Sequence, residues 1–280
     1  MKVFISVDME GVTGVTDPDD VTEGAAGYER ARALMTADAN AAIRGAFQGG
    51  ASYVLVNDAH STMRNLLVDE LDPRARLVRG FHKPLCMMEG LDDSFSAALL
   101  VGCHARAGAG GGILEHTLLG KQVHELWCDG EPMGEIGLNA LLAGSYGVPI
   151  AFVAGDDVAC REAEQELGPE VETFAVKRAI DRFVADCLPP EKTANGISEG
   201  VTRAIGGSPR SPLRRSLPLA FGLTFNSSTI AATCALVPGV RRTGARSTEF
   251  SADVMPKAME LILVQLLLAL QVGGTAGGYG

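Results

Sequence analysis

The 280-residue chain carries a formal net charge of −10, and 46% of its residues are hydrophobic. The negative charge argues against nucleic-acid binding, because no basic stripe could offset it. Six cysteines form no CxxC pair, which favours free thiols over a disulfide framework or a cysteine zinc site. No signal-peptide core follows Lys2, and the apolar run at 261–270 is too short to cross a bilayer. We therefore expect a cytoplasmic protein without a membrane span.

The first expected element is a buried strand that ends in two carboxylates. Residues 3–5 are apolar, and Asp8 and Glu10 follow with one residue between them. Side chains two apart in an extended chain point to the same side, and Gly11 allows a sharp turn behind them. Two close carboxylates repel each other unless a cation lies between them, which favours one or two divalent metal ions. An Asp-x-Glu pair at a strand end is also common without a metal.

A long helix and two more strands add histidines to this pattern. Apolar residues recur at three- and four-residue spacing over 28–47, which predicts a helix. A strand over 51–56 leads to His60, and a strand over 97–102 leads to His104. Sites in open α/β sheets form at the carboxyl ends of the strands. One of the three strands ends in two carboxylates, and each of the other two leads to a histidine. This combination predicts a shared metal site.

Strand and helix signals continue to alternate up to residue 188. We expect a strand over 123–128, a helix over 134–142 with Glu135 in its first turn, and a strand over 149–154. Asp156 or Asp157 then caps a helix. The glycines at 108–112 lack the Lys-Ser/Thr of a phosphate-binding P-loop and do not open a helix.

The composition of the sequence and the pattern of expected elements change after residue 188. A Pro- and Arg-rich stretch, two β-like runs and a long apolar helix follow. We therefore predict an α/β fold with a mostly parallel central sheet flanked by helices, and with a smaller α+β C-terminal portion. The predicted parts are a metal-binding catalytic domain over 1–188, the α+β portion over 189–272, and a flexible Gly-rich tail over 273–280.

Motifs within the first 180 residues resemble a known enzyme family. They are Ser6-Val7-Asp8-Met9-Glu10-Gly11, Asn57-Asp58-Ala59-His60, Gly102-Cys103-His104, His116-Thr117 and Gly134-Glu135-Ile136-Gly137. This set resembles the zinc-dependent D-aminopeptidases of the dipeptide-permease-operon (DppA) type. One departure is Ser61, which stands where that pattern has glycine.

The resemblance implies a metal centre, a catalytic histidine and an assembly. The metal ligands it implies for two zinc ions per subunit are Asp8, Glu10, His60, His104 and Glu135. It also implies that His116 takes part in catalysis and that the chain forms a ring-shaped homodecamer. Carboxylates and neutral imidazoles suit zinc, and a bridging hydroxide would both balance the charge and act as the nucleophile. The remaining histidines, His82 and His124, are interpreted as structural or surface residues.

The sequence thus predicts a zinc aminopeptidase for short peptides with an N-terminal D-amino acid, with D-alanyl peptides as the expected substrates. Two alternatives stay open. The same metal centre could hydrolyse L-peptides or other small amides, because chirality depends on pocket shape. The chain could also be a non-catalytic peptide-binding assembly that keeps the fold.

Overall fold

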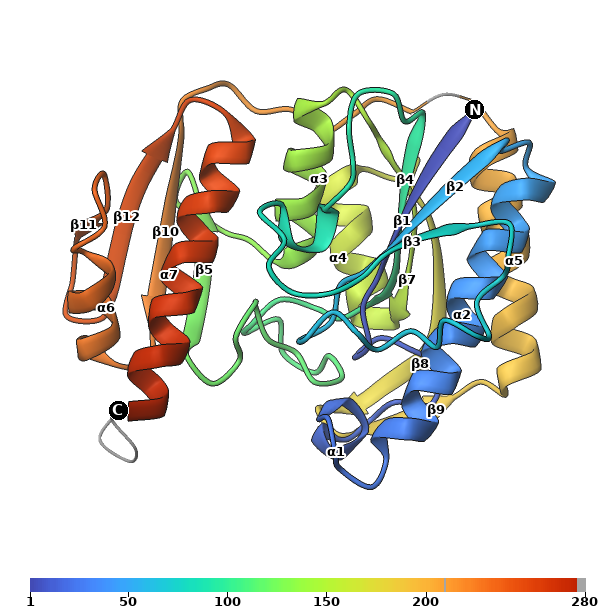
Figure 1. Ribbon diagram of the computed structural model, residues 1–280, viewed down its shortest axis with the longest axis horizontal. Helices are drawn as coiled ribbons and strands as arrows, with labels where there is room; N and C mark the ends of the chain where they lie inside the picture. The colour runs from blue at the N-terminus through green and yellow to red at the C-terminus, as the bar shows by residue number, and fades with distance from the viewer. Residues whose placement is uncertain (209, 276–280) are drawn as a thin grey trace.

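The computed structural model describes residues 1–208 and 210–275, which form two lobes built on two sheets (Figure 1). The first sheet has the strand order β3-β2-β1-β4-β7-β8-β9, and all its pairs are parallel except β8 with β9. Its strands are β1 Lys2–Val7, β2 Tyr53–Asp58, β3 Arg76–Val78, β4 Ala97–Cys103, β7 Ile150–Asp156, β8 Glu172–Asp181 and β9 Val184–Cys187. The mostly parallel sheet is the one predicted.

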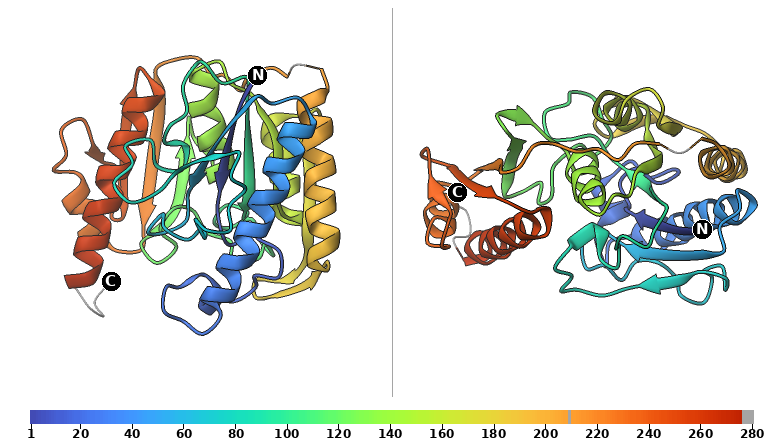
Figure 2. Two further views of the ribbon diagram at one scale, coloured as in Figure 1. Left: turned by 45° about the vertical axis from the view of Figure 1, so that its right-hand side comes forward. Right: turned by 90° about the horizontal axis from the view of Figure 1, so that it is seen from above.

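Helices cover both faces of this sheet (Figure 2). The helices α2 (Tyr28–Gln48) and α5 (Pro190–Gly206) pack on one face, and α3 (Glu135–Ser145) and α4 (Asp157–Leu167) pack on the other. The alternation along β1 follows these layers, since Val3, Ile5 and Val7 face the α2 side whereas Phe4 faces the α3 side. Burial on both faces explains why the strands read as continuous apolar runs.

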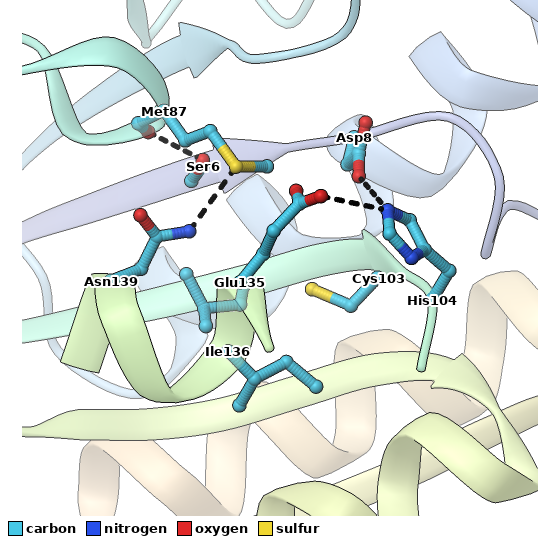
Figure 3. A pocket seen from close by; sticks show the side chains of 9 residues that line it. Ser6, Asp8, Met87, Cys103, His104, Glu135, Ile136 and Asn139 are labelled. Atoms are coloured by element: carbon cyan, nitrogen blue, oxygen red, sulfur yellow. Dashed lines mark hydrogen bonds and ion pairs between the residues drawn. The ribbon is translucent and has the colours of Figure 1, made fainter. Parts of the chain in front are cut away.

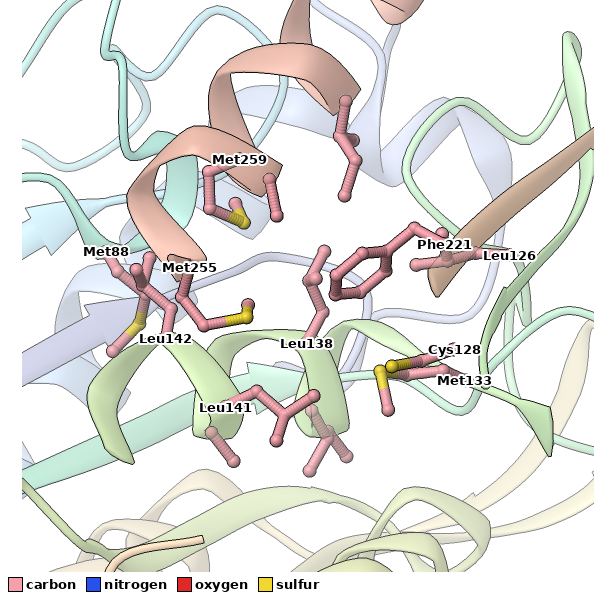
Figure 4. Close-up of a cluster of buried hydrophobic side chains, with 14 of the residues drawn as sticks. Met88, Leu126, Cys128, Met133, Leu138, Leu141, Leu142, Phe221, Met255 and Met259 are labelled. Atoms are coloured by element: carbon pink, nitrogen blue, oxygen red, sulfur yellow. The ribbon is translucent and has the colours of Figure 1, made fainter. Parts of the chain in front are cut away.

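The second sheet is antiparallel, with the strand order β11-β12-β10-β5-β6. Its elements are β5 Val123–Cys128, β6 Glu131–Pro132, β10 Leu219–Phe225, α6 Ser228–Cys234, β11 Arg241–Arg242, β12 Ser247–Ala252 and α7 Met255–Thr275. Two short helices complete the described elements, namely α1 Pro18–Val21 and a 3₁₀ turn at Cys86–Met88. Helix α3 lies between the lobes, and its Leu138, Leu141 and Leu142 share one core with Phe221 and Met255 (Figure 4).

The chain crosses between the lobes more often than the predicted boundary at residue 188 allows. Strands β5 and β6 come from the first predicted part but pair within the second sheet. Helix α5 comes from the second part but packs on α2 and the first sheet. The apolar residues of β5 and α5 indicate only that each element has a buried side. The sequence pattern does not indicate which of the two sheets covers that side.

Helix α7 is longer than the apolar run at 261–270. The segment Met255–Gly274 has a mean hydropathy of 1.5 and could cross a membrane by length and composition alone. In the structure, its Ile262 and Leu266 pack into the core, and the buried Gln265 accepts a hydrogen bond from the Thr248 hydroxyl at 2.7 Å. These are the contacts of a core helix. Residues 273–275 of the predicted tail belong to α7, and residues 276–280 lie outside the described part of the chain.

Candidate metal centre

All six residues singled out in the sequence meet at the carboxyl edge of the parallel sheet. Asp8 and Glu10 follow β1, His60 follows β2, His104 follows β4, His116 lies between β4 and β5, and Glu135 opens α3. The side chains of the five predicted ligands are buried. Figure 3 shows the Asp8 and Glu135 carboxylates directed at the same nitrogen of the His104 ring. The structure therefore brings the predicted ligands and the predicted catalytic histidine into one cluster.

Gly11 allows the loops after β1 and β4 to approach each other closely. Its N–H donates to the Gly102 carbonyl at 2.8 Å, and a Cβ at position 11 would lie 1.8 Å from the Cys103 carbonyl oxygen. The loops after β1 and β4 can touch only because this side chain is absent.

Two histidines join the three carboxylates into one network. His60 Nδ1 lies 3.3 Å from Asp8 Oδ1 and 3.1 Å from Glu10 Oε2. His104 Nε2 lies 3.5 Å from Asp8 Oδ2 and 3.4 Å from Glu135 Oε1. Asp8 is thus the carboxylate that both histidines contact, with one oxygen toward each.

The outer nitrogen of each of these histidines is held by a backbone carbonyl. His60 Nε2 lies 2.9 Å from the Val21 oxygen, and His104 Nδ1 lies 3.0 Å from the Ala105 oxygen. A carbonyl only accepts, so each outer nitrogen carries the proton, and in the neutral ring the inner nitrogen keeps a lone pair. This is the usual arrangement for histidines that bind a metal, so the donor set fits divalent metal ions.

Two overlapping groups of ligand atoms could each hold a metal ion. One group is Asp8, Glu10 and His104, and the other is His104, His116 and Glu135; within each group the ligand atoms lie within 4.8 Å of one another. The Leu118 N–H donates to Glu135 Oε1 at 2.6 Å and orients that carboxylate. The two groups share His104, so they lie side by side within one cluster.

The close packing of carboxylates shifts the pKa values of Asp8, His60 and His104. Burial, reinforced by Glu10, raises the pKa of Asp8 to about 7. Burial is the largest single effect on His60 and His104 and opposes their charged forms, but the surrounding carboxylates together outweigh it and raise each histidine pKa well above its ordinary value. The carboxylates therefore favour positive charge in this space.

His116 has the opposite tendency. Its ring stacks on His104 with centroids 4.0 Å apart, and its Nδ1 lies 2.9 Å from the Leu114 carbonyl oxygen. Burial, together with the positive charge of His104, lowers the pKa of His116. A neutral ring whose Nδ1 carries the proton has its lone pair on Nε2, which suits proton transfer.

Lys177 is a site residue that sequence reasoning missed. This lysine of β8 is 1% exposed. Its Nζ donates to the carbonyls of Glu10, Val12 and Val15 at 2.7, 2.8 and 2.6 Å. All three ammonium N–H groups thus hold the loop that carries the acidic ligand pair.

The same loop is held from a second side by Asp38 of α2. Its carboxylate accepts from the Thr13 N–H and from the Thr13 hydroxyl, both at 2.9 Å. Burial raises the pKa of Asp38 to about 6.

A second buried lysine holds the loop of His60. Lys83 Nζ donates to Asn57 Oδ1, to the Asp58 carbonyl and to the Val78 carbonyl, at 2.7, 2.6 and 3.2 Å. Asn65 adds a contact, since its Nδ2 donates to the His60 carbonyl at 2.7 Å. Buried ammonium groups therefore position two of the ligand-bearing loops.

The other residues weighed in the sequence lie outside this chemistry. His82 and His124 are exposed, as interpreted. Asp156 caps α4 by accepting from the Ala159 N–H at 2.7 Å, which confirms its structural role. Burial raises the pKa of the Cys103 thiol well above its ordinary value, so this cysteine stays protonated and is a poor nucleophile.

Comparison with known proteins decides the family. The Peptidase_M55 family model, described as D-aminopeptidase, matches residues 1–264. The chain belongs to the D-aminopeptidase family. The resemblance found in the motifs is confirmed, and it extends well beyond the first 180 residues.

A curated relative and a solved structure agree with this assignment. A D-aminopeptidase of Bacillus subtilis (strain 168) is 41% identical over 273 residues, covering 97% of this chain and 98% of the relative. The solved structure has a TM-score of 0.93 at 41% identity and covers 97% of this chain and 98% of its own. It is described as the Zn-dependent D-aminopeptidase DppA from Bacillus subtilis, a self-compartmentalizing protease. The predicted α/β fold and peptidase class are therefore confirmed.

We predict that Lys177→Met weakens zinc binding by roughly 10- to 100-fold, as is typical when a group that orients metal ligands is lost. The substitution leaves three buried carbonyls without their donor and frees the loop that carries Asp8 and Glu10. Zinc affinity would be measured by competition with a chromogenic chelator, on protein shown to be folded by circular dichroism.

Lys192→Met is the matched control for this test, because Lys192 is exposed on α5. A folded Lys177→Met protein with the zinc affinity of the wild type would contradict the positioning role.

Proposed function

We propose that the chain is a dinuclear zinc aminopeptidase that removes an N-terminal D-amino acid from short peptides, D-alanyl peptides in particular. The observation that carries this proposal is the cluster of three buried carboxylates and two buried histidines, with the half-buried His116 beside them. Membership of the D-aminopeptidase family and the zinc dependence of the 41% identical DppA support the choice of reaction and metal.

The proposed ligands of the two ions are Asp8, Glu10, His60, His104 and Glu135. Asp8 is the best candidate to bridge them, because its two oxygens face different histidines. When bound, zinc would polarise the scissile carbonyl and lower the pKa of the attacking water. Binding also requires His60 and His104 to be neutral, so it should release protons.

The chain's own residues account for the proton transfers of hydrolysis. Water adds to the carbonyl carbon, the C–N bond breaks, and the leaving amine needs a proton. His116 can accept a proton from the water at Nε2 and return it to the amine, since its Nδ1–H is held by the Leu114 carbonyl. Burial lowers the pKa of His116 and so favours the neutral ring, which can accept a proton.

The stereochemistry of the substrate is the finer part of the proposal. A hydrolase of L-peptides or other small amides could use the same metal ligands, and the D-preference rests on the family. A non-catalytic peptide-binding assembly is disfavoured because the predicted ligands and His116 are all present and clustered.

A matched pair of substrates tests the reaction. We predict that zinc-loaded protein hydrolyses D-Ala-Gly-Gly, whereas L-Ala-Gly-Gly is cleaved much more slowly. The released alanine would be quantified by chromatography, with a chelator-treated sample as the control. Faster cleavage of the L-peptide would establish the alternative, and no cleavage of either would contradict the peptidase assignment for such substrates.

A second prediction concerns His116. We expect His116→Ala to keep its zinc but to lose turnover by roughly 10²- to 10⁴-fold, because general acid–base and oxyanion-stabilising groups contribute on this scale. Zinc content would be measured by elemental analysis beside kcat, with His82→Ala as a surface control. Loss of zinc would make His116 a ligand, and an unchanged kcat would leave it structural.

We further propose that the chain assembles into a closed ring of ten subunits. The related DppA is described as self-compartmentalizing, and exposed Val264 and Leu270 on α7 are suited to burial between subunits. Light scattering should give a mass ten times that of the 29.3 kDa chain. A monomer or dimer would contradict the ring.

A further inference from the structure

A polar hollow beside His116 lies between the two lobes. Its volume is about 260 Å³, and the residues that line it include Arg106, Glu115, His116, Glu125 and Arg182. The segment between β4 and β5, which connects the first sheet to the second, supplies three of these residues (Figure 1). Crevices between lobes are common places for substrates, and one that includes a proton-transfer group is a candidate substrate subsite.

Two arginines of this hollow have no carboxylate partner. Arg106 Nη1 donates to the Ala107 carbonyl at 3.0 Å, and Arg182 Nη2 donates to the Glu115 carbonyl at 3.2 Å. Within residues 1–208 and 210–275, neither guanidinium forms an ion pair with a carboxylate, whereas Arg178 on the same strand as Lys177 pairs with Asp186 at 3.5 Å. A guanidinium has five N–H donors, so most donors of each arginine remain available.

Arg182 contacts the segment that carries His116. Its own carbonyl accepts from the Leu114 N–H at 2.9 Å, in addition to the contact of its side chain with Glu115. These two bonds tie the turn between β8 and β9 to the residues just before His116. The backbone of Arg182 therefore keeps a set position relative to His116, and its exposed side chain lies at the rim of the hollow.

We propose that this hollow binds the C-terminal carboxylate of the leaving part of the substrate through Arg106 and Arg182. The inference rests on the proposed function and specifies its substrate class, namely very short peptides with a free carboxylate. Planar guanidinium groups bind carboxylates through paired, charge-assisted hydrogen bonds. The hollow is smaller than the roughly 300–1,000 Å³ of typical ligand pockets, which favours a leaving part of one or two residues.

Two glutamates narrow this specificity. Glu115 and Glu125 also line the hollow, and Glu115 Oε2 accepts from the Gly112 N–H at 3.2 Å. Their carboxylates repel anions, so a substrate carboxylate is favoured only where it lies against the two guanidinium groups, and the rest of the hollow suits a polar main chain. A second acidic group in the leaving part would be repelled.

The test compares D-Ala-Gly with its C-terminal amide on zinc-loaded protein. The wild type should have a higher kcat/KM for the acid, and Arg182→Met should lower kcat/KM for the acid by roughly 10- to 100-fold, as loss of a charge-assisted hydrogen bond implies. The loss should appear mainly in KM, and the value for the amide should change little. Arg106→Met should act in the same direction, and Arg178→Met is the exposed-arginine control.

The possible results distinguish a failure of the carboxylate subsite from a failure of the proposed peptidase function. If the wild type cleaves acid and amide equally well, or if Arg182→Met slows both by the same factor, the carboxylate subsite is overturned while the peptidase assignment stands. Equal values for wild type and Arg182→Met on the acid also overturn it. If neither substrate is cleaved, the proposed function fails and the subsite fails with it.

Discussion

Crowding of negative charge in a buried space is the constraint on which the rest of the site depends. Asp8, Glu10 and Glu135 meet where water cannot screen their repulsion, and only positive charge makes this arrangement favourable. The raised pKa values of His60 and His104 show how strongly the space favours cations. Divalent metal ions would supply this positive charge, and in the proposed centre they would leave His60 and His104 neutral.

The fold meets this constraint by holding the backbone of the loops as well as the side chains of the cluster. Lys177 and Lys83 each bind carbonyls of a loop that carries ligands, so the peptide chain is fixed from behind while the ligand side chains face the site. Each ammonium is buried, and burial lowers both lysine pKa values to about 8. Loop positions defined to this degree are what metal ligands require, because coordination tolerates small errors only.

The strand-end pattern was sufficient to predict that Asp8, Glu10, His60 and His104 lie together, because parallel strands end at one edge of a sheet. Glu135 and His116 came from the family resemblance, since no local pattern marks them. Lys177 could not be predicted, because its partners lie more than 160 residues away in the sequence. The pairing of β5 with the second sheet was also missed, because its partner β10 is distant in the sequence. Ser61 has a φ of 47°, so it adopts the left-handed conformation that glycine favours at this point of the family pattern.

The number of metal ions needed for turnover is the most direct test of the two-metal account. Metal-depleted protein would be titrated with zinc while bound zinc and hydrolysis of a D-alanyl peptide are measured on the same samples. The account predicts that activity rises until two zinc ions are bound per chain and then stays constant. Full activity at one zinc ion per chain would contradict it.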